Sequence, residues 1–492
     1  MDETQPLLQE TSLLFNEQRR DELSRKDIVD FAGDGDVDNP IEWPKAYKWG
    51  IVSLLAFMSF TVTFTCISVV PIANRIVDDL DDGHASKSAS VLLVTIWELG
   101  EAAGPLLIAP LSEVFGRYPV MNVANVLFIG AIALSALSQT TPLLIAARAL
   151  TGLAVASNVL NPAIVGDMFI PEQRGSPMSL VMLAPLVGGA VGPAISGAVA
   201  ESLGWRQVVW MSALLATVCE LGLLTCFRET YKVAILRRRA ERLRRETGNA
   251  CLRTAFETSD ESNSKKLWSY VMRPAIVLAG SGVLQALSIF GSIVFAYFYI
   301  MSTTLASILE DLYHQSPTEA GVSFIAFSVG SVISVVFCNL FLDRIYIKLR
   351  DAHGGKGKPE YRLPVVIVGA FTLPFAIALY GWTAHLRLPL GLLTFSVALI
   401  GMTLMLSFLP FYAYVVDAFG VYAASGMTAV IVLRCLMGTF LPLTTAPLVE
   451  RFGYGLAFTI LASFGLLIAP IPVLILRYGS AWRQRSKYTR EE

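Results

Sequence analysis

Twelve apolar stretches, each close to the length that crosses a lipid bilayer, constrain this chain more than any other feature. A membrane-spanning helix needs about 20 mostly apolar residues. Six stretches lie near residues 48–71, 88–110, 119–138, 142–168, 176–200 and 206–227. Six more lie near 274–301, 318–342, 364–382, 388–414, 419–446 and 453–476. The sequence therefore predicts an all-α polytopic membrane protein with twelve transmembrane helices in two six-helix bundles.

The composition excludes several functional classes. Only 16% of the 492 residues are charged, against about 25% in soluble domains. A net charge of −1 gives no electrostatic reason to expect nucleic-acid binding. The six cysteines and four histidines show no metal-ligand or catalytic spacing, and the chain has no GxxxxGK[ST] phosphate loop. We expect no enzyme, no cofactor and no metal, and we expect an ion gradient to supply the energy.

Lysine and arginine are distributed unevenly between the loops. They concentrate in the stretch after span 6, in the loop after span 8 and in the C-terminal tail, whereas the loop after span 1 reads DDLDDGH. Because cytosolic loops carry the excess of basic residues, both termini are expected in the cytosol. The expected segments are a disordered cytosolic tail (1–47), an N-terminal bundle (48–227), a cytosolic central loop (228–273), a C-terminal bundle (274–476) and a cytosolic tail (477–492).

Two leucine pairs in the N-terminal tail bear on the question of which cellular membrane contains the protein. The sequence ETQPLL at residues 3–8 resembles an acidic dileucine sorting signal, and Leu13–Leu14 is a second candidate. Chance matches in a disordered tail are the alternative explanation. We expect a multi-pass protein of the plasma membrane, with the vacuolar membrane as the alternative.

The two halves of the chain resemble each other weakly. After span 5 the chain reads ESLGW (201–205), and after span 11 it reads ERFGY (450–454). After span 2 it reads LSE (111–113), and after span 8 it reads FLD (341–343). Matching positions in a six-plus-six layout indicate two parallel repeats, which in transporters enclose a substrate site near the bilayer midplane.

Four stretches carry a family resemblance: APLSEVFGR (109–117), RALTG (148–152), the glycine-rich segment 188–197, and ETY (229–231) with the basic run that follows. They resemble the twelve-span drug:proton antiporters of the major facilitator superfamily, in the branch typical of fungi. The resemblance covers roughly residues 40–480. Two positions depart from the family pattern, Ala109 and Ser196, where glycine is usual. The resemblance implies a monomeric transporter whose partners are protons, a small-molecule cargo and the lipid bilayer.

Four charged residues inside the spans are candidates for proton coupling. Glu98 and Glu101 are one helical turn apart, and two close carboxylates cannot both ionise cheaply. The resemblance assigns Arg148 a part in coupling, and Glu220 is a second acid candidate, alone in span 6. The alternatives are that Glu101 pairs permanently with an arginine or faces water, and that Arg148 binds backbone carbonyls or reaches the interface.

The polar turn between spans 2 and 3 is the candidate cytosolic gate. It contains Glu113, Gly116 and Arg117, and Asp167 or Arg174 is expected to pair with its charges and hold the bundles together in one state. Such a pair should be only moderately strong. A fixed tight turn, with Asp167 in a structural salt bridge, is the alternative.

The remaining candidates lie in span 5 and in the second half. Gly188, Gly189, Gly192, Pro193 and Gly197 are expected to thin and bend span 5 so that another helix packs closely, as in the antiporter motif. The second-half charges are Asp343, Asp417 and Arg434; structure is the favoured role of the last two and substrate contact the lesser one. Eleven aromatic residues are candidates for an apolar cavity, of which a minority should touch cargo: Phe57, Phe60, Phe64, Phe290, Phe295, Tyr297, Phe298, Phe408, Phe411, Tyr412 and Tyr414.

The sequence therefore predicts a secondary-active transporter that exports a small amphipathic organic compound, such as a drug, toxin or secondary metabolite, in exchange for protons. The first alternative keeps the fold and reverses the flux, giving uptake of a nutrient or polyamine. The second is a non-transporting membrane receptor.

Overall fold

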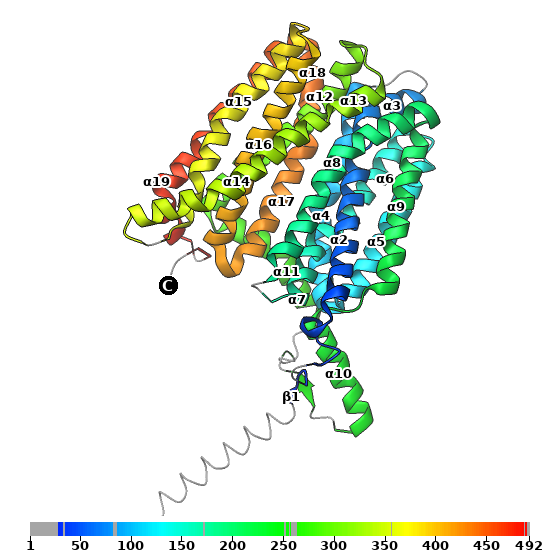
Figure 1. Cartoon of the computed structure of the whole chain (residues 1–492), viewed down its shortest axis with the longest axis vertical. Coiled ribbons are helices and arrows are strands. Elements are labelled where there is room, and N and C mark those ends of the chain that lie inside the picture. Colours follow the sequence, from blue (N-terminus) through cyan, green and yellow to red (C-terminus); the bar gives the residue numbers. More distant parts are fainter. Residues whose placement is uncertain are drawn as a thin grey trace, which may run out of the picture.

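The computed structural model describes residues 28–32, 35–81, 86–170, 173–249, 252–254, 256, 263–355, 357–486 and 488–489. The leucine pairs of the N-terminal tail lie outside these residues. Two bundles of helices stand side by side, and a short module projects from one end of them (Figure 1). We call the end at which β1 (Ile28–Val29) and the last turn of α19 (Pro470–Gln484) lie the terminal face, and the other end the opposite face.

The first bundle is built from spans 1 to 6. Its helices are α2 (Lys45–Ile67) with η2 (Val70–Ile72) and α3 (Ala73–Leu80), α4 (Lys87–Phe115), α5 (Arg117–Ala136), α6 (Thr141–Leu153) with α7 (Ser157–Met168), α8 (Gly175–Leu203) and α9 (Trp205–Cys226). Spans 1 and 4 are each broken into two helices.

The second bundle follows α10 (Lys232–Thr247) and α11 (Asn263–Ala279). Its helices are α12 (Gly282–Asp311), α13 (Pro317–Ser323) with α14 (Ile325–Ala352), η4 (Pro359–Arg362) with α15 (Leu363–His385), α16 (Leu390–Phe419), η5 (Gly420–Tyr422) with α17 (Ala423–Phe440), η6 (Leu441–Thr444), α18 (Thr445–Ile468) and α19 (Pro470–Gln484). Across the bundles, α4 packs on α17 and α8 packs on α13.

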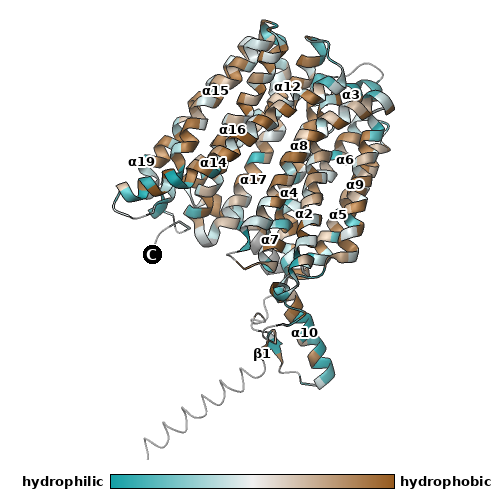
Figure 2. Ribbon diagram, in the orientation of Figure 1, coloured by the Kyte–Doolittle hydropathy of each residue, from teal (hydrophilic) through white to brown (hydrophobic). Residues whose placement is uncertain are grey.

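The described residues contain 11 helices that are long and apolar enough to cross a membrane. The last of these runs over Ala423–Gln484 and is twice the usual length because it joins two spans. Gly453 reverses the chain there with φ 72° and ψ 168°, so the twelve predicted spans are present. Hydrophobic residues cover the outer faces of the bundles, and hydrophilic ones gather at the ends and on α10 (Figure 2). These features indicate a protein that crosses the membrane several times.

The predicted repeat is visible in the turn glycines. Gly204, which starts α9, has φ 91° and ψ 161°, close to the values of Gly453 at the start of span 12. A side chain disfavours such a positive φ, so glycine at this place lets both turns form. The two matching sequences therefore build the same tight turn on the opposite face.

Glycines also set the distance between α4 and α6. A methyl group added at Gly100 would overlap the carbonyl oxygen of Ala149, and one added at Gly152 would overlap that of Trp97. The two backbones are thus in direct contact, as small residues permit in membrane bundles. This contact holds the helix that carries both Glu98 and Glu101.

We expect Gly152→Val to lower the free energy of unfolding by about 3 kcal/mol, the upper part of the range for overpacked cores, because the two helices must separate. Thermal unfolding of the purified protein in detergent measures the effect. Gly130→Val is the matched control, since a methyl group at Gly130 meets nothing within 4 Å. Equal losses in the two variants would contradict this account of the packing.

The module on the terminal face joins the N-terminal segment to α10. β1 (Ile28–Val29) pairs in parallel with β2 (Arg253–Thr254), and Asp36 lies 2.6 Å from Arg239 of α10. The described residues 28–32 and 35–47 of the expected disordered tail thus include defined contacts, and the expected central loop contains α10 and the start of α11. The basic run forms α10, which buries Leu236 and Ala240 at i, i+4 on one face and Ala234 on another.

The charge of Asp36 stabilises this docking over the neutral pH range. The backbone N–H of Ala32 and the guanidinium of Arg239 both hydrogen-bond to its carboxylate, which lowers the pKa of Asp36 to about 2. A lowered pKa stabilises the docked form above the ordinary pKa of an aspartate, and this stabilisation is lost as the pH falls through about 2. The contribution is therefore complete at pH 5 and above.

We expect Asp36→Asn to speed amide hydrogen exchange in residues 28–44 at both pH 5 and pH 7, by the same factor after correction for intrinsic exchange. Hydrogen exchange read by mass spectrometry measures it. A difference present at pH 7 and absent at pH 5 would contradict the assignment of the low pKa to Asp36.

Candidate functional site between the bundles

A cavity of about 340 Å³ lies between the two bundles at mid-height of the helices. Both bundles contribute to its wall through α2, α4, α8, α12, α14, α16 and α17. Its aromatic wall includes four of the eleven predicted residues: Phe295, Phe298, Phe408 and Tyr412. Trp97, Tyr299, Phe324 and Phe327 also line it and were not predicted. The cavity combines a mostly aromatic wall with three charged side chains, Glu98, Glu101 and Arg434.

Glu98 is buried on α4 and faces the second bundle. The hydroxyl of Tyr299 donates a hydrogen bond of 2.7 Å to its Oε1. Its Oε2 has no hydrogen-bond partner in the part of the chain that the structure describes, although the Cys435 side chain lies beside it. A buried carboxylate with one unsatisfied oxygen is costly when charged. A proton on that oxygen would remove the charge without disturbing the bond from Tyr299.

Glu101 is fully hydrogen-bonded, in contrast to Glu98. Its Oε1 accepts from Asn158 at 2.8 Å and from Arg434 at 3.4 Å, and its Oε2 accepts from Trp97 at 3.2 Å. Arg434 in turn donates to the Tyr412 hydroxyl at 3.0 Å. The Glu101–Arg434 ion pair joins the two bundles inside the cavity.

Arg148 hydrogen-bonds to backbone and lies behind the cavity wall. It donates to the carbonyl oxygens of Thr65 and Cys66, each at 2.9 Å, and its guanidinium stacks 4.9 Å from the ring of Trp97. These carbonyls belong to the last turn of α2, where the helix leaves its acceptors unsatisfied and carries partial negative charge. Arg148 therefore caps a helix end inside the bundle, which is the alternative that the sequence had left open.

Glu220 does not line the cavity. It lies on α9, where its Oε2 accepts a 2.7 Å hydrogen bond from Asn125 of α5. Its Oε1 has no partner among the described residues. Of the four predicted coupling residues, the structure brings only Glu98 and Glu101 to the cavity.

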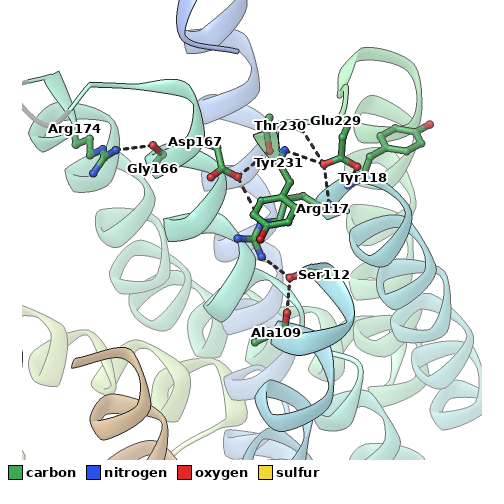
Figure 3. Close-up of polar contacts among 10 residues, drawn as sticks. All are labelled: Ala109, Ser112, Arg117, Tyr118, Gly166, Asp167, Arg174, Glu229, Thr230 and Tyr231. Atoms are coloured by element: carbon green, nitrogen blue, oxygen red, sulfur yellow. Dashed lines mark hydrogen bonds and ion pairs between the residues drawn. The ribbon is translucent and has the colours of Figure 1, made fainter. Parts of the chain in front are cut away.

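The turn between α4 and α5 is held by a network on the terminal face (Figure 3). Arg117 lies 3.5 Å from Asp167, stacks 4.7 Å from the ring of Tyr231 and donates to the Ser112 hydroxyl. All these partners lie in the first bundle or directly after it. The predicted pair of Arg117 with Asp167 is present in this conformation as a contact within one half of the molecule.

Glu229 is the residue of this network that the sequence reasoning missed. Its carboxylate accepts hydrogen bonds from the backbone N–H groups of Arg117 (2.8 Å), Thr230 (3.1 Å) and Tyr231 (3.0 Å). It occupies the space where a side chain at Gly116 would lie, and Gly116 has a φ of 100°. The signal was available, because Glu229 opens the ETY segment that carried part of the family resemblance.

The other two gate candidates are placed differently from the expectation. Arg174 donates to the backbone carbonyl of Gly166 at 2.8 Å (Figure 3). It also donates to that of Phe169 at 2.8 Å and so caps the end of α7. Glu113 is partly exposed, and within the described ranges it has no hydrogen-bond or ion-pair partner. In this conformation neither residue joins the bundles, so their gating role stays a prediction.

The glycines of span 5 divide between two partners. Gly188 and Gly192 let α8 approach α2, where added methyl groups would lie 2.8 Å from the Phe60 oxygen and 3.5 Å from the Phe64 side chain. Gly189 faces the cavity. Gly197 contacts the backbone of Pro317, and reciprocally Gly321 contacts the backbone of Pro193. The opposite-face end of the motif therefore packs against the other bundle.

Further contacts close the opposite face. Arg75 lies 3.3 Å from Glu310, and Lys87 lies 3.7 Å from Asp311; both pairs are exposed and so individually weak. On the terminal half, the described residues show no hydrogen bond or ion pair between the bundles. The cavity is thus closed toward the opposite face.

The second-half charges separate into two sites. Asp343 and Asp417 both pair with Arg362 near the terminal face, Asp343 at 3.2 Å. This triad joins the ends of spans 8 and 10 to the start of span 9, as Arg117 and Asp167 join spans 3 and 4. Arg434 lies away from them in the cavity wall. This position would allow substrate contact, which was the less favoured of the two roles predicted for Arg434.

The comparisons with known proteins agree with this architecture. The family model described as Major Facilitator Superfamily matches residues 51–442. The chain belongs to the major facilitator superfamily. It is therefore a membrane transporter, and neither its family nor its relatives indicate an enzyme.

The relatives of this superfamily member are fungal transporters. It is 34% identical to the efflux pump radE of Floropilus chiversii over 95% of this chain and 87% of that protein. It is 31% identical to the MFS-type transporter penM of Penicillium rubens, over 96% and 92% of the two chains. The sequence-based family prediction is thus confirmed.

Solved structures of the superfamily share the fold. The partially occluded inward open conformation of the xylose transporter XylE from E. coli superposes with a TM-score of 0.65 at 15% identity, over 88% of this chain and 98% of that one. At this identity the similarity concerns the fold alone.

Proposed function

We propose that this transporter exports a small amphipathic organic compound in exchange for protons. The observation that carries the proposal is the cavity between the bundles, which joins an aromatic wall to a buried acid with an unpartnered oxygen. Aromatic surface suits a flat apolar body, and a few convergent polar groups orient it. One of the relatives is named an efflux pump, which supports the direction.

The distribution of basic residues supports a cytosolic terminal face. With that orientation the conformation described here is closed toward the outside, and cargo enters the cavity from the cytosol. The exposed pairs Arg75–Glu310 and Lys87–Asp311 are weak enough to break in each cycle. The plasma membrane is the proposed location, with the vacuolar membrane as the alternative.

The charges of the cavity suggest how proton and cargo compete. Two carboxylates face one guanidinium, so the unprotonated site favours a neutral or cationic cargo over an anion. Protonation of Glu98 would remove one negative charge and weaken the hold on such a cargo. A monomer is sufficient for this exchange, because both walls of the cavity come from one chain.

Transport into sealed vesicles containing the purified protein tests the proposal. Antiport predicts that an acid-inside pH gradient drives accumulation of an amphipathic aromatic compound, and that a protonophore collapses it. Accumulation driven only by an acid-outside gradient would instead indicate proton-coupled uptake of a nutrient or polyamine. No movement of any compound in a broad panel would favour a receptor.

A further inference from the structure

A second cavity, of about 210 Å³, lies outside the bundles on the terminal face. It forms where the N-terminal segment meets the connection from α9 to α10. Trp43 lines it, together with four arginines: Arg228, Arg238, Arg239 and Arg242. Two segments that are far apart in the sequence, 37–43 and 228–242, thus form the hollow, and all four arginines come from the second.

The positive charge of this cavity is not balanced by its own residues. Asp38 and Glu229 are the two acids in its lining, against four arginines. Glu229 is already hydrogen-bonded by three backbone N–H groups of the neighbouring turn, and it lies 3.9 Å from Arg238. Much of its capacity to accept hydrogen bonds is therefore used.

Two of the four arginines have no acidic partner. Arg239 is paired with Asp36, whereas in the described part of the chain Arg228 and Arg242 have no carboxylate within 4.0 Å. Both are exposed, and Arg228 lies 5.7 Å from the ring of Tyr47. Both residues line the same cavity, and their charge there is not neutralised by a carboxylate of the described residues.

We propose that this cavity binds a phosphate-bearing anion. The fork of an arginine matches the oxygens of a phosphate, and several arginines around one hollow favour a group with more than one negative charge. The cavity adjoins the end of the bundles, where a phosphorylated lipid headgroup is available and where basic segments attract anionic lipids. The same phosphate groups on a soluble molecule have the same chemistry.

Binding at this site would reach the turn between α4 and α5. Arg238 also donates to the carbonyl oxygen of Phe115, at 3.4 Å, and Phe115 precedes Gly116. An anion that draws Arg238 into the cavity competes with Glu229 and with this carbonyl. The inference therefore links an anion on the terminal face to the segment that must rearrange when the bundles rock.

Binding of three probes to the full chain in uncharged detergent tests the proposal. The probes are a short-chain phosphatidylinositol bisphosphate, inositol trisphosphate, and short-chain phosphatidylcholine as the lipid without net charge. The test variant is Arg228→Gln/Arg242→Gln. The control is Arg245→Gln/Lys348→Gln, which removes the same charge from exposed residues outside the cavity.

We expect the bisphosphate lipid to bind about tenfold or more weakly to the test variant than to the parent and the control, because charge-assisted hydrogen bonds are lost. Trisphosphate binding as tight as that of the lipid would identify a soluble phosphate as the ligand, and binding of the lipid alone would identify a headgroup. Equal affinity in the test variant and the parent, an equal loss in the control, or no binding of either phosphorylated probe would overturn the proposal.

Discussion

Replacing Glu98 with glutamine should abolish the part of cargo transport that depends on the pH gradient, while cargo binding survives. Glutamine keeps an acceptor for the 2.7 Å hydrogen bond from Tyr299 and has nearly the same size. It cannot take up or release a proton, so the exchange loses its driving ion. Transport into acid-inside vesicles should fall to the level that a protonophore leaves in the parent protein, and cargo should still bind in detergent, with the weakened affinity of the protonated site.

Glu220→Gln is the matched control for this experiment. Glu220 is also a buried glutamate of the first bundle with one unpartnered oxygen, but it lies between α5 and α9 and does not line the cavity. It should keep gradient-driven transport. Full transport by Glu98→Gln would exclude Glu98 as the coupling acid. Loss in Glu220→Gln alone would move the coupling site to α9.

The sequence predicted features that depend on local pattern. The spans follow from runs of apolar residues, and the turns at Gly204 and Gly453 follow from two similar five-residue segments. The pair of Arg117 with Asp167 was among the alternatives, because both residues lie at neighbouring ends of consecutive helices. Composition and local spacing contain this information without any knowledge of tertiary contacts.

Which residues come together in the site depends on contacts between segments that are far apart in the sequence, and these contacts could not be predicted. Glu101 and Arg434 are 333 positions apart, and no periodicity in one helix indicates which residue of another helix it will meet. For the same reason the sequence could name eleven aromatic residues and could not select the four that line the cavity. Their selection depends on the rotation of each helix about its axis.

Arg148 shows a different limit of the sequence. An arginine inside the membrane is costly unless polar groups bind it. The sequence allowed either acids or backbone carbonyls as the partners of Arg148. The carbonyls of Thr65 and Cys66 are free because span 1 breaks at the end of α2. That break lies within a long apolar run, where Pro71 is the local signal of it, because a proline has no N–H to bond the carbonyl of Ile67.

The ion pair between Glu101 and Arg434 gives the second large expected effect. Arg434→Gln alone should lower the free energy of unfolding by about 3–5 kcal/mol, because it leaves Glu98 and Glu101 in the cavity without a counter-ion. Glu101→Gln should lower it less, because Glu98 still faces Arg434. The side chains of Glu101 and Arg434 are well buried, with 10% and 17% of their surface exposed. Thermal or chemical unfolding of the purified protein in detergent measures each loss.

The double variant Glu101→Gln/Arg434→Gln should lose less than the sum of the two single losses, with a coupling energy of about 1–3 kcal/mol. Without Glu101 and Arg434, Glu98 is the one acid left in the cavity lining and can take up a proton. The single oxygen of a glutamine at position 101 can keep one of the two hydrogen bonds from Asn158 and Trp97. Additive losses would show that the two side chains act independently.

Because this pair is a polar contact between the bundles inside the cavity, the double variant should also change the balance between the two orientations of the transporter. Spin labels on the opposite face, at positions 78 and 314, would then report a shift in their distance distribution that Glu220→Gln does not produce.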